Sequence, residues 1–256
     1  MQNMDFQLIE EGKYKFIETN SKGPNLMLLH GLFGALSNFQ GIIHHFGQKY
    51  NVIVPILPIY ELPIFQASVD GLVEYLNKFA KHKKLSDLNL VGNSLGGHIA
   101  LLFALADMTR IRSITLTGSS GLFESGMGSS FPKRGDYDYI KRKTEETFFN
   151  PAVATKELVD EVYDIVNDRA KAIRVIATAK SALRHNLGDK LQHISVPTLL
   201  IWGKNDSVTP PFVAEKFKEL IPNSSLYFLE ECSHAPMMEK PDEFNSILEA
   251  FLINTA

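Results

Sequence analysis

A serine in a glycine-rich turn is the residue of this 256-residue chain whose surroundings point most clearly to chemistry. The turn, Gly92-Asn-Ser94-Leu-Gly96-Gly, fits the pattern Gly-x-Ser-x-Gly and lies between an apolar run at 88–91 and an apolar helical pattern at 95–106. A serine on such a strand-to-helix turn holds a strained backbone and projects its hydroxyl above the sheet. The N-terminus of the following helix favours developing negative charge. We predict that Ser94 is a nucleophile; the alternative is a tight Gly/Ser turn without catalysis.

A serine hydroxyl needs a base, and the base needs an acid that orients it. In strand–turn–helix sites of this kind the order along the chain is Ser, then Asp or Glu, then His. Asp206 follows the apolar run 198–202, and His234 follows the run 225–229. Both side chains are therefore expected at the carboxyl edge of the sheet, beside Ser94. We predict a Ser-His-Asp triad; the alternatives are a turn-forming aspartate and a histidine bonded to backbone.

Two turns are expected to supply the backbone N–H groups that an acyl-transfer site needs for its oxyanion. One donor is Leu95, directly after the nucleophile, and the other is Leu32 in the turn His30-Gly-Leu-Phe-Gly34, which follows the apolar run 26–30. The alternative for the turn at 30–34 is a glycine turn that connects a strand to a helix and has no further role. We expect His30 to organise this loop rather than to act as a second base.

Short apolar runs alternate with helical patterns along most of the chain. This alternation predicts an α/β protein with a mostly parallel sheet and helices on both of its faces. An antiparallel hairpin is expected at 6–9 and 14–18. The other expected strands are 26–30, 52–57, 88–91, 111–117, 198–202 and 225–229, and the expected helices are 37–46, 69–81 with Ser68 as N-cap, 95–106, 212–220 and 241–252.

The segment from about 118 to 193 interrupts this alternation. It begins with loop-like Gly/Ser sequence and continues with amphipathic helical patterns around 138–149, 156–166 and 170–184, without a predicted strand. We therefore predict a core formed by 1–120 and 194–256, with 121–193 inserted as a helical cap over one end of the sheet.

Taken together, the motifs resemble those of the α/β-hydrolase superfamily. The matching segments, in order, are His30-Gly-Leu-Phe-Gly, Gly92-Asn-Ser-Leu-Gly-Gly, Trp202-Gly-Lys-Asn-Asp206, and Ser233-His234 with Glu239-x-Pro241-x-x-Phe244. The resemblance covers the two core segments and implies that the insertion is the family's variable cap. It implies a serine hydrolase that needs neither cofactor nor metal. Because the nucleophile is Ser94 rather than an aspartate, dehalogenation of haloalkanes and hydrolysis of epoxides are disfavoured.

Within that superfamily the elbow and the following Gly118-Ser-Ser-Gly-Leu resemble carboxylesterases and the meta-cleavage-product C–C hydrolases. We expect cleavage of an ester or related acyl bond of a small, largely apolar molecule (EC 3.1.1). The first alternative is C–C hydrolysis of a dienoate (EC 3.7.1), and a less favoured one is a small-molecule receptor that retains a slow triad.

Residues of the cap are expected to select the substrate. The C–C hydrolases hold the dienoate carboxylate with a cap arginine, for which Arg169, Arg174 and Arg184 are available. Of these we take Arg169, together with Phe33 and Phe123, as candidate substrate contacts.

The composition of the chain limits which binding partners and which cellular compartment we expect. The net charge of −3 gives no electrostatic support for nucleic-acid binding, and a single cysteine, Cys232, excludes an internal disulfide and a cysteine-based zinc site. We interpret Cys232 as a small buried hydrophobe. The N-terminal sequence has no signal-peptide pattern, and the apolar runs are too short to span a membrane. We expect a cytoplasmic monomer or homodimer whose partner is a small-molecule substrate, with no nucleic acid and no membrane.

Overall fold

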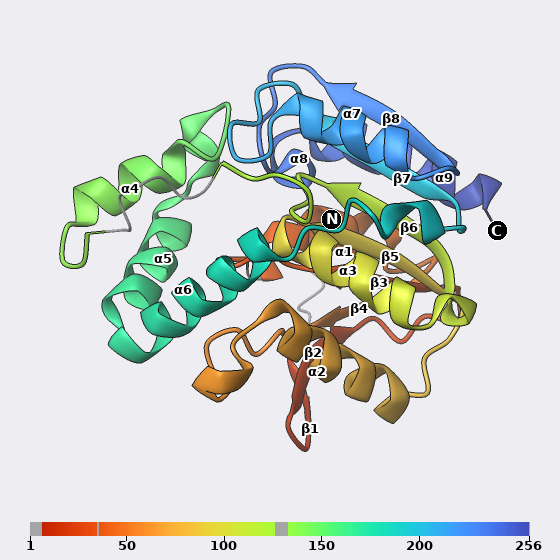
Figure 1. Cartoon of the computed structure of the whole chain (residues 1–256), viewed down its shortest axis with the longest axis horizontal. Coiled ribbons are helices and arrows are strands. Elements are labelled where there is room, and N and C mark those ends of the chain that lie inside the picture. The colour runs from red at the N-terminus through yellow and green to blue at the C-terminus, as the bar shows by residue number, and fades with distance from the viewer. Residues whose placement is uncertain (1–6, 35, 126–132, 256) are drawn as a thin grey trace.

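The computed structural model describes residues 7–34, 36–125 and 133–255. Within them an eight-stranded sheet forms the centre of the fold, in the order β1-β2-β4-β3-β5-β6-β7-β8 (Figure 1). The strands are β1 (Ile9–Glu11), β2 (Tyr14–Glu18), β3 (Asn25–Leu29), β4 (Asn51–Pro55), β5 (Leu88–Asn93), β6 (Ile111–Thr117), β7 (Thr198–Gly203) and β8 (Ser224–Leu229). The pairs β1–β2 and β2–β4 are antiparallel, and the other pairs are parallel. The predicted mostly parallel sheet is confirmed.

Helices cover both faces of this sheet, as predicted (Figure 1). On one face α2, α3 and α7 pack into a single apolar cluster, and on the other α1, α8 and α9 pack into a second. Their bounds are α1 (Gln40–Phe46), α2 (Val69–His82), α3 (Leu95–Ala106), α7 (Pro211–Leu220), α8 (Pro236–Glu239) and α9 (Pro241–Asn254). The hydroxyl of Ser68 accepts a hydrogen bond from the N–H of Gly71, which confirms the predicted N-cap of α2.

The last strand departs from the expectation of strands buried on both faces. The central strands β5 and β7 are buried along their whole length, but β8 alternates between half-buried and exposed residues up to its buried last residue, Leu229, and Tyr227 is 49% exposed. This strand lies at the edge of the sheet, where α7 covers one of its faces. The residues that point to the other face therefore remain in contact with solvent.

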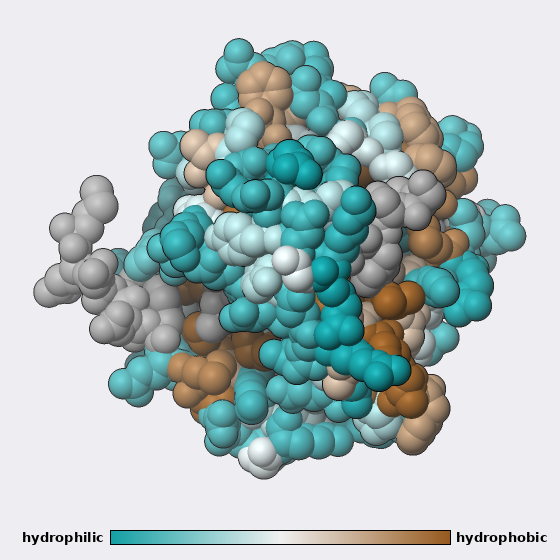
Figure 2. Space-filling model, turned by 90° about the vertical axis from the view of Figure 1, so that its left-hand side faces the viewer, coloured by the Kyte–Doolittle hydropathy of each residue, from teal (hydrophilic) through white to brown (hydrophobic). Residues whose placement is uncertain are grey.

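Between β6 and β7 the described residues form three α-helices: α4 (Tyr137–Glu145), α5 (Lys156–Asn167) and α6 (Arg169–Arg184). The described part of this insertion contains no strand, in agreement with the prediction. The helices lie together beside the sheet (Figure 1), and their outward surface is mostly hydrophilic (Figure 2). Ile140, Val162 and Val166 form a small apolar cluster within the insertion, against which Phe33 of the core packs. The division at 120/121 and 193/194 stays a prediction.

Candidate active site

The backbone at Ser94 has the strain that was predicted for it. Ser94 joins β5 to α3 with φ 55° and ψ −121°, in a region that residues with a side chain rarely adopt. Its N–H donates a hydrogen bond of 3.1 Å to the carbonyl of Thr117, the last residue of the neighbouring strand β6. The surrounding structure therefore holds the strained turn in place.

Gly96 allows the close contact between α3 and β3 that this turn requires. A Cβ at position 96 would lie 1.9 Å from the carbonyl oxygen of Leu29. We expect Gly96→Ala to lower the free energy of unfolding by about 3 kcal/mol, because the helix must move off the strand. Urea denaturation measures this change. Gly41→Ala is the matched control, since a Cβ there would meet its nearest atom at 3.4 Å in α1. Equal stability of the two variants would contradict the expected clash.

Asp206 and His234 are joined by a hydrogen bond at the ends of neighbouring strands. His234 Nδ1 donates to Asp206 Oδ2 at 2.9 Å. The other carboxylate oxygen, Oδ1, accepts from the N–H groups of Val208 at 2.8 Å and Thr209 at 2.9 Å. Asp206 therefore forms the turn considered as its alternative role and also orients the imidazole. Because Nδ1 carries the proton, Nε2 is left as the basic nitrogen of the ring.

The charges of this pair stabilise each other despite burial. Burial opposes ionisation of Asp206, but the charge and hydrogen bond of His234, with the donors of Thr209, lower the pKa of its carboxyl group. Burial likewise opposes protonation of His234, yet Asp206 and, more weakly, Glu124 and Glu239 raise the pKa of its imidazole above 6.5. Above that pKa the ring is neutral and able to accept a proton.

The structure brings Ser94 and His234 onto adjoining loops. The side-chain amide of Asn93 donates to the carbonyl oxygen of His234 at 3.1 Å and to that of Thr117 at 3.0 Å. No hydrogen bond joins the Ser94 hydroxyl to His234 in the described part of the chain. Catalytic hydrogen bonds are often long in a site without substrate and shorten when the substrate binds.

The turn at 30–34, which contains Leu32, lies against Ser94. A Cβ on Gly31 would lie 3.6 Å from Ser94 Oγ. The hydroxyl of Tyr60 donates to the carbonyl of Leu32 at 2.6 Å, and the N–H groups of Leu32 and Leu95 donate to no other described residue. Their role as oxyanion donors stays a prediction. His30 organises this loop as expected, since its Nε2 accepts from the Leu57 N–H at 3.1 Å.

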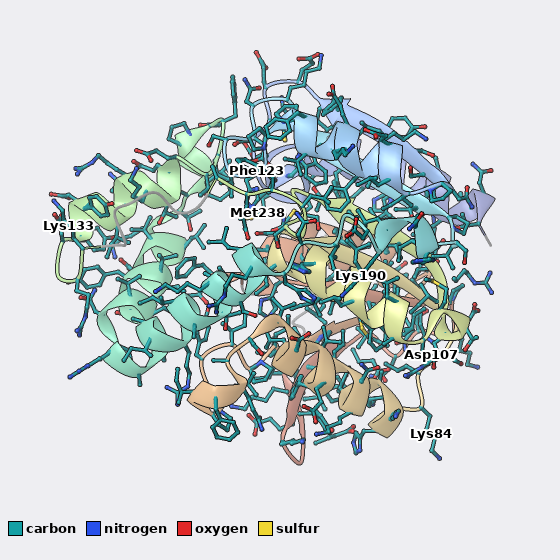
Figure 3. The ribbon with its side chains drawn as sticks, in the orientation of Figure 1. Lys84, Asp107, Phe123, Lys133, Lys190 and Met238 are labelled. Atoms are coloured by element: carbon teal, nitrogen blue, oxygen red, sulfur yellow. The ribbon has the colours of Figure 1, made fainter. Side chains whose placement is uncertain are left out.

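The three candidate substrate contacts lie in different surroundings. Phe33 is half-buried and packs against both the main core and the apolar cluster of the insertion. Phe123, near the start of the insertion (Figure 3), is 48% exposed, and its ring centroid is 5.3 Å from that of Phe212 in α7. Arg169 is exposed and is the first residue of α6. The roles of Phe33, Phe123 and Arg169 as substrate contacts stay predictions.

Arg174 and Arg184, the other two arginines considered for a dienoate carboxylate, bond to backbone carbonyls. Arg174 donates to Leu62 at 2.6 Å and to Ala170 at 2.8 Å, while Arg184 donates to Lys180 at 3.1 Å. Among the residues that the structure describes, no group of three His, Cys, Asp or Glu side chains could hold a metal ion. No helix in the described ranges is both long and apolar enough to cross a membrane.

Two carboxylates near His234 were not predicted as site residues. Glu124 lies near the start of the insertion, where burial raises the pKa of its own carboxyl group and its charge raises that of His234. Its position shortly after the carboxyl end of β6 was the only signal in the sequence. Glu239 was noted only as part of a motif, and its contacts with the His234 loop depend on the folded structure. Cys232 is fully buried, as predicted.

Comparison with known proteins agrees with the fold and with the motifs. The family model described as alpha/beta hydrolase fold matches residues 24–241. A crystal structure of MGS-MChE2, an alpha/beta hydrolase enzyme from a metagenome of sediments of the Mar Chica lagoon in Morocco, has 40% sequence identity and a TM-score of 0.79, covering 97% of this chain and 98% of that one.

Two curated relatives carry more specific names. The pimeloyl-[acyl-carrier protein] methyl ester esterase of Nitrosomonas europaea is 26% identical over 91% of this chain and 98% of its own length. The 2-hydroxy-6-oxo-6-(2'-aminophenyl)hexa-2,4-dienoic acid hydrolase of Metapseudomonas resinovorans is 25% identical over 94% of this chain and 88% of its own length. The predictions of the superfamily and of a hydrolase are thereby confirmed: the chain belongs to the alpha/beta hydrolase fold family.

Proposed function

We propose that this protein is a serine hydrolase that cleaves an ester or related acyl bond of a small, largely apolar substrate, with Ser94, His234 and Asp206 as its catalytic triad. The observation that carries the proposal is the 2.9 Å hydrogen bond from His234 Nδ1 to Asp206. This bond leaves Nε2 of His234 as the base. The loop of His234 adjoins that of Ser94, whose backbone is held at φ 55°.

In the proposed mechanism Ser94 Oγ attacks the substrate carbonyl carbon while His234 Nε2 takes the hydroxyl proton. The N–H groups of Leu32 and Leu95 bind the oxyanion of the tetrahedral intermediate. The bond to the leaving group then breaks, and His234 returns the proton to that group. Water attacks the acyl-enzyme in the same manner, giving up a proton to His234, and the acid product leaves as Ser94 regains its hydrogen. Asp206 stabilises the imidazolium in both halves.

The charges around His234 favour an ester over a dienoate. The three side chains that raise the pKa of His234 are all carboxylates: Asp206, Glu124 and Glu239. A dienoate would bring another carboxylate toward these negative charges. The esterase relative supports hydrolysis of an ester, and the dienoic acid hydrolase relative keeps C–C cleavage as the second candidate. That reaction would need a cation near the site, and the hydrogen bonds of Arg174 and Arg184 go to backbone carbonyls instead.

Hydrolysis of p-nitrophenyl esters from acetate to decanoate tests the proposal, with Ser94→Ala as the blank. We expect clear turnover that decreases as the acyl chain lengthens. A 2-hydroxy-6-oxo-hexadienoate should be cleaved more slowly than the best ester. Faster cleavage of the dienoate would favour the C–C hydrolase, and a folded protein without turnover of either substrate above the blank would contradict the triad.

A further inference from the structure

Glu239 accepts hydrogen bonds from both residues that flank His234. The side chain belongs to the short helix α8, and its Oε1 lies 2.9 Å from the N–H nitrogen of Ser233 and 3.4 Å from that of Ala235. The two donors are the neighbours of the histidine in the chain. One oxygen therefore restrains the backbone on each side of the imidazole.

The other oxygen of the same carboxylate binds the insertion. Glu239 Oε2 accepts from the N–H of Phe149 at 2.7 Å. A second bond runs alongside, because the N–H of His234 donates to the carbonyl of Thr147 at 3.2 Å. The segment 147–149, which follows α4, is thus tied to the histidine loop through Glu239 and directly through His234 itself.

We propose that Glu239 is a positioning residue that clamps the loop of His234 to the end of helix α4 and so couples the placement of the insertion to that of the imidazole. The catalytic consequence rests on the proposed function. A displacement of segment 147–149 would pull on the backbone on both sides of His234. Docking of the insertion around a substrate would in turn fix the position of Nε2.

The chemistry of the clamp requires a carboxylate. Backbone N–H groups approach both Glu239 oxygens, so each oxygen must be an acceptor. Glutamine would turn an NH₂ group toward one of these donors and lose that bond. Aspartate keeps the charge but is one methylene shorter, so it cannot reach both the histidine loop and Phe149.

Cys232 offers a measurement of the clamp that does not depend on catalysis. It is the single cysteine of the chain, fully buried, with its sulfur 4.0 Å from Glu239 Oε1. We expect both Glu239→Gln and Glu239→Asp to speed modification of Cys232 by dithionitrobenzoate about tenfold, because an unpaired buried N–H favours opening of the loop. The Glu239 charge also raises the pKa of the Cys232 thiol, so the faster labelling of Glu239→Asp, which keeps the charge, reports the opening alone. Glu230→Gln is the matched control, since this exposed glutamate pairs with Lys204. Equal labelling rates in wild type, control and Glu239→Gln would overturn the clamp.

Kinetics test the catalytic part of the proposal. With the best p-nitrophenyl ester we expect Glu239→Gln to lower kcat about tenfold and to leave KM within about twofold, since the histidine rather than the substrate is misplaced. The acid limb of kcat/KM should move to lower pH, because Glu239 no longer raises the pKa of His234 while Asp206 and Glu124 still do. Glu239→Asp should lower kcat with a smaller shift of this limb. Faster labelling with an unchanged kcat and pH profile would reduce Glu239 to a structural role.

The two proposals fail in different ways. If wild type shows no turnover above Ser94→Ala, the proposed function is wrong, and the labelling of Cys232 still decides whether the clamp exists. If wild type is active and Glu239→Gln behaves as Glu230→Gln in all assays, only the positioning role is wrong. If Glu239→Gln does not fold, Glu239→Asp is used for the same two measurements. A labelling rate of Cys232 and a kcat equal to those of wild type would then overturn the proposal.

Discussion

Replacing Ser94 by alanine is expected to lower kcat on the best p-nitrophenyl ester by about six orders of magnitude. The reason is that the hydroxyl is the atom that forms the bond to the acyl carbon. Without it, His234 and Asp206 have no proton to take and no intermediate to form. The fold should persist, because the side chain of Ser94 makes no hydrogen bond with the described residues and alanine fits wherever serine does. Steady-state rates and urea denaturation of the same preparation measure both effects.

A control and a chemical probe make the result specific to this serine. Ser246→Ala removes a hydroxyl that bonds the carbonyl of Asp242 on the surface of α9, and it should keep full activity. A fluorophosphonate should add once to wild type, at the peptide that contains Ser94, and should not add to Ser94→Ala. Wild-type activity in Ser94→Ala, or phosphonylation at another residue, would refute the assignment of the nucleophile.

Elements with strong local signals were predicted nearly to the residue. The apolar helix 95–106 and the strand 111–117 agree with α3 and β6 at both ends. Their boundaries are marked by residues whose local preferences are clear, such as the glycine-rich elbow before α3. The predicted helix 37–46 is less regular, since it begins as a 3-10 turn at Leu36–Phe39 and becomes α1 only at Gln40. Periodicity alone does not distinguish these two kinds of helix.

The site was predictable only as far as motifs mark the ends of strands. Asp206 and His234 were found because parallel strands end at one edge of the sheet, and they are hydrogen-bonded. Motifs at strand ends could not predict which other side chains lie near the triad. The charge of Glu124 acts on His234 because the packing of the folded chain decides which side chains lie near the triad. Glu239 reaches Phe149 across 90 positions of sequence, a contact that no local pattern encodes.

The pKa of His234 gives the pH dependence that Asp206 should control. The free imidazole accepts the proton of Ser94 only when it is neutral, so kcat/KM is expected to rise with pH through the pKa of His234. The Asp206 carboxylate raises this pKa above 6.5. In Asp206→Asn that attraction is lost while burial still disfavours the charged ring. The acid limb of the variant should therefore lie at lower pH than that of wild type.

Asp206→Asn is expected to lower kcat by about four orders of magnitude, even at a pH where His234 is fully neutral in both proteins. The amide can turn its NH₂ group toward Nδ1, which then accepts a hydrogen bond, so the proton of the ring moves to Nε2 and the base is lost. The amide oxygen can still accept from the N–H groups of Val208 and Thr209, so the loop should hold its turn. Asp189→Asn, on the exposed segment after α6, is the control with the same loss of charge. Profiles of kcat and kcat/KM against pH for wild type, Asp206→Asn and Asp189→Asn measure the effect. If Asp206→Asn kept more than about a tenth of wild-type kcat, the role of Asp206 would be limited to forming its turn.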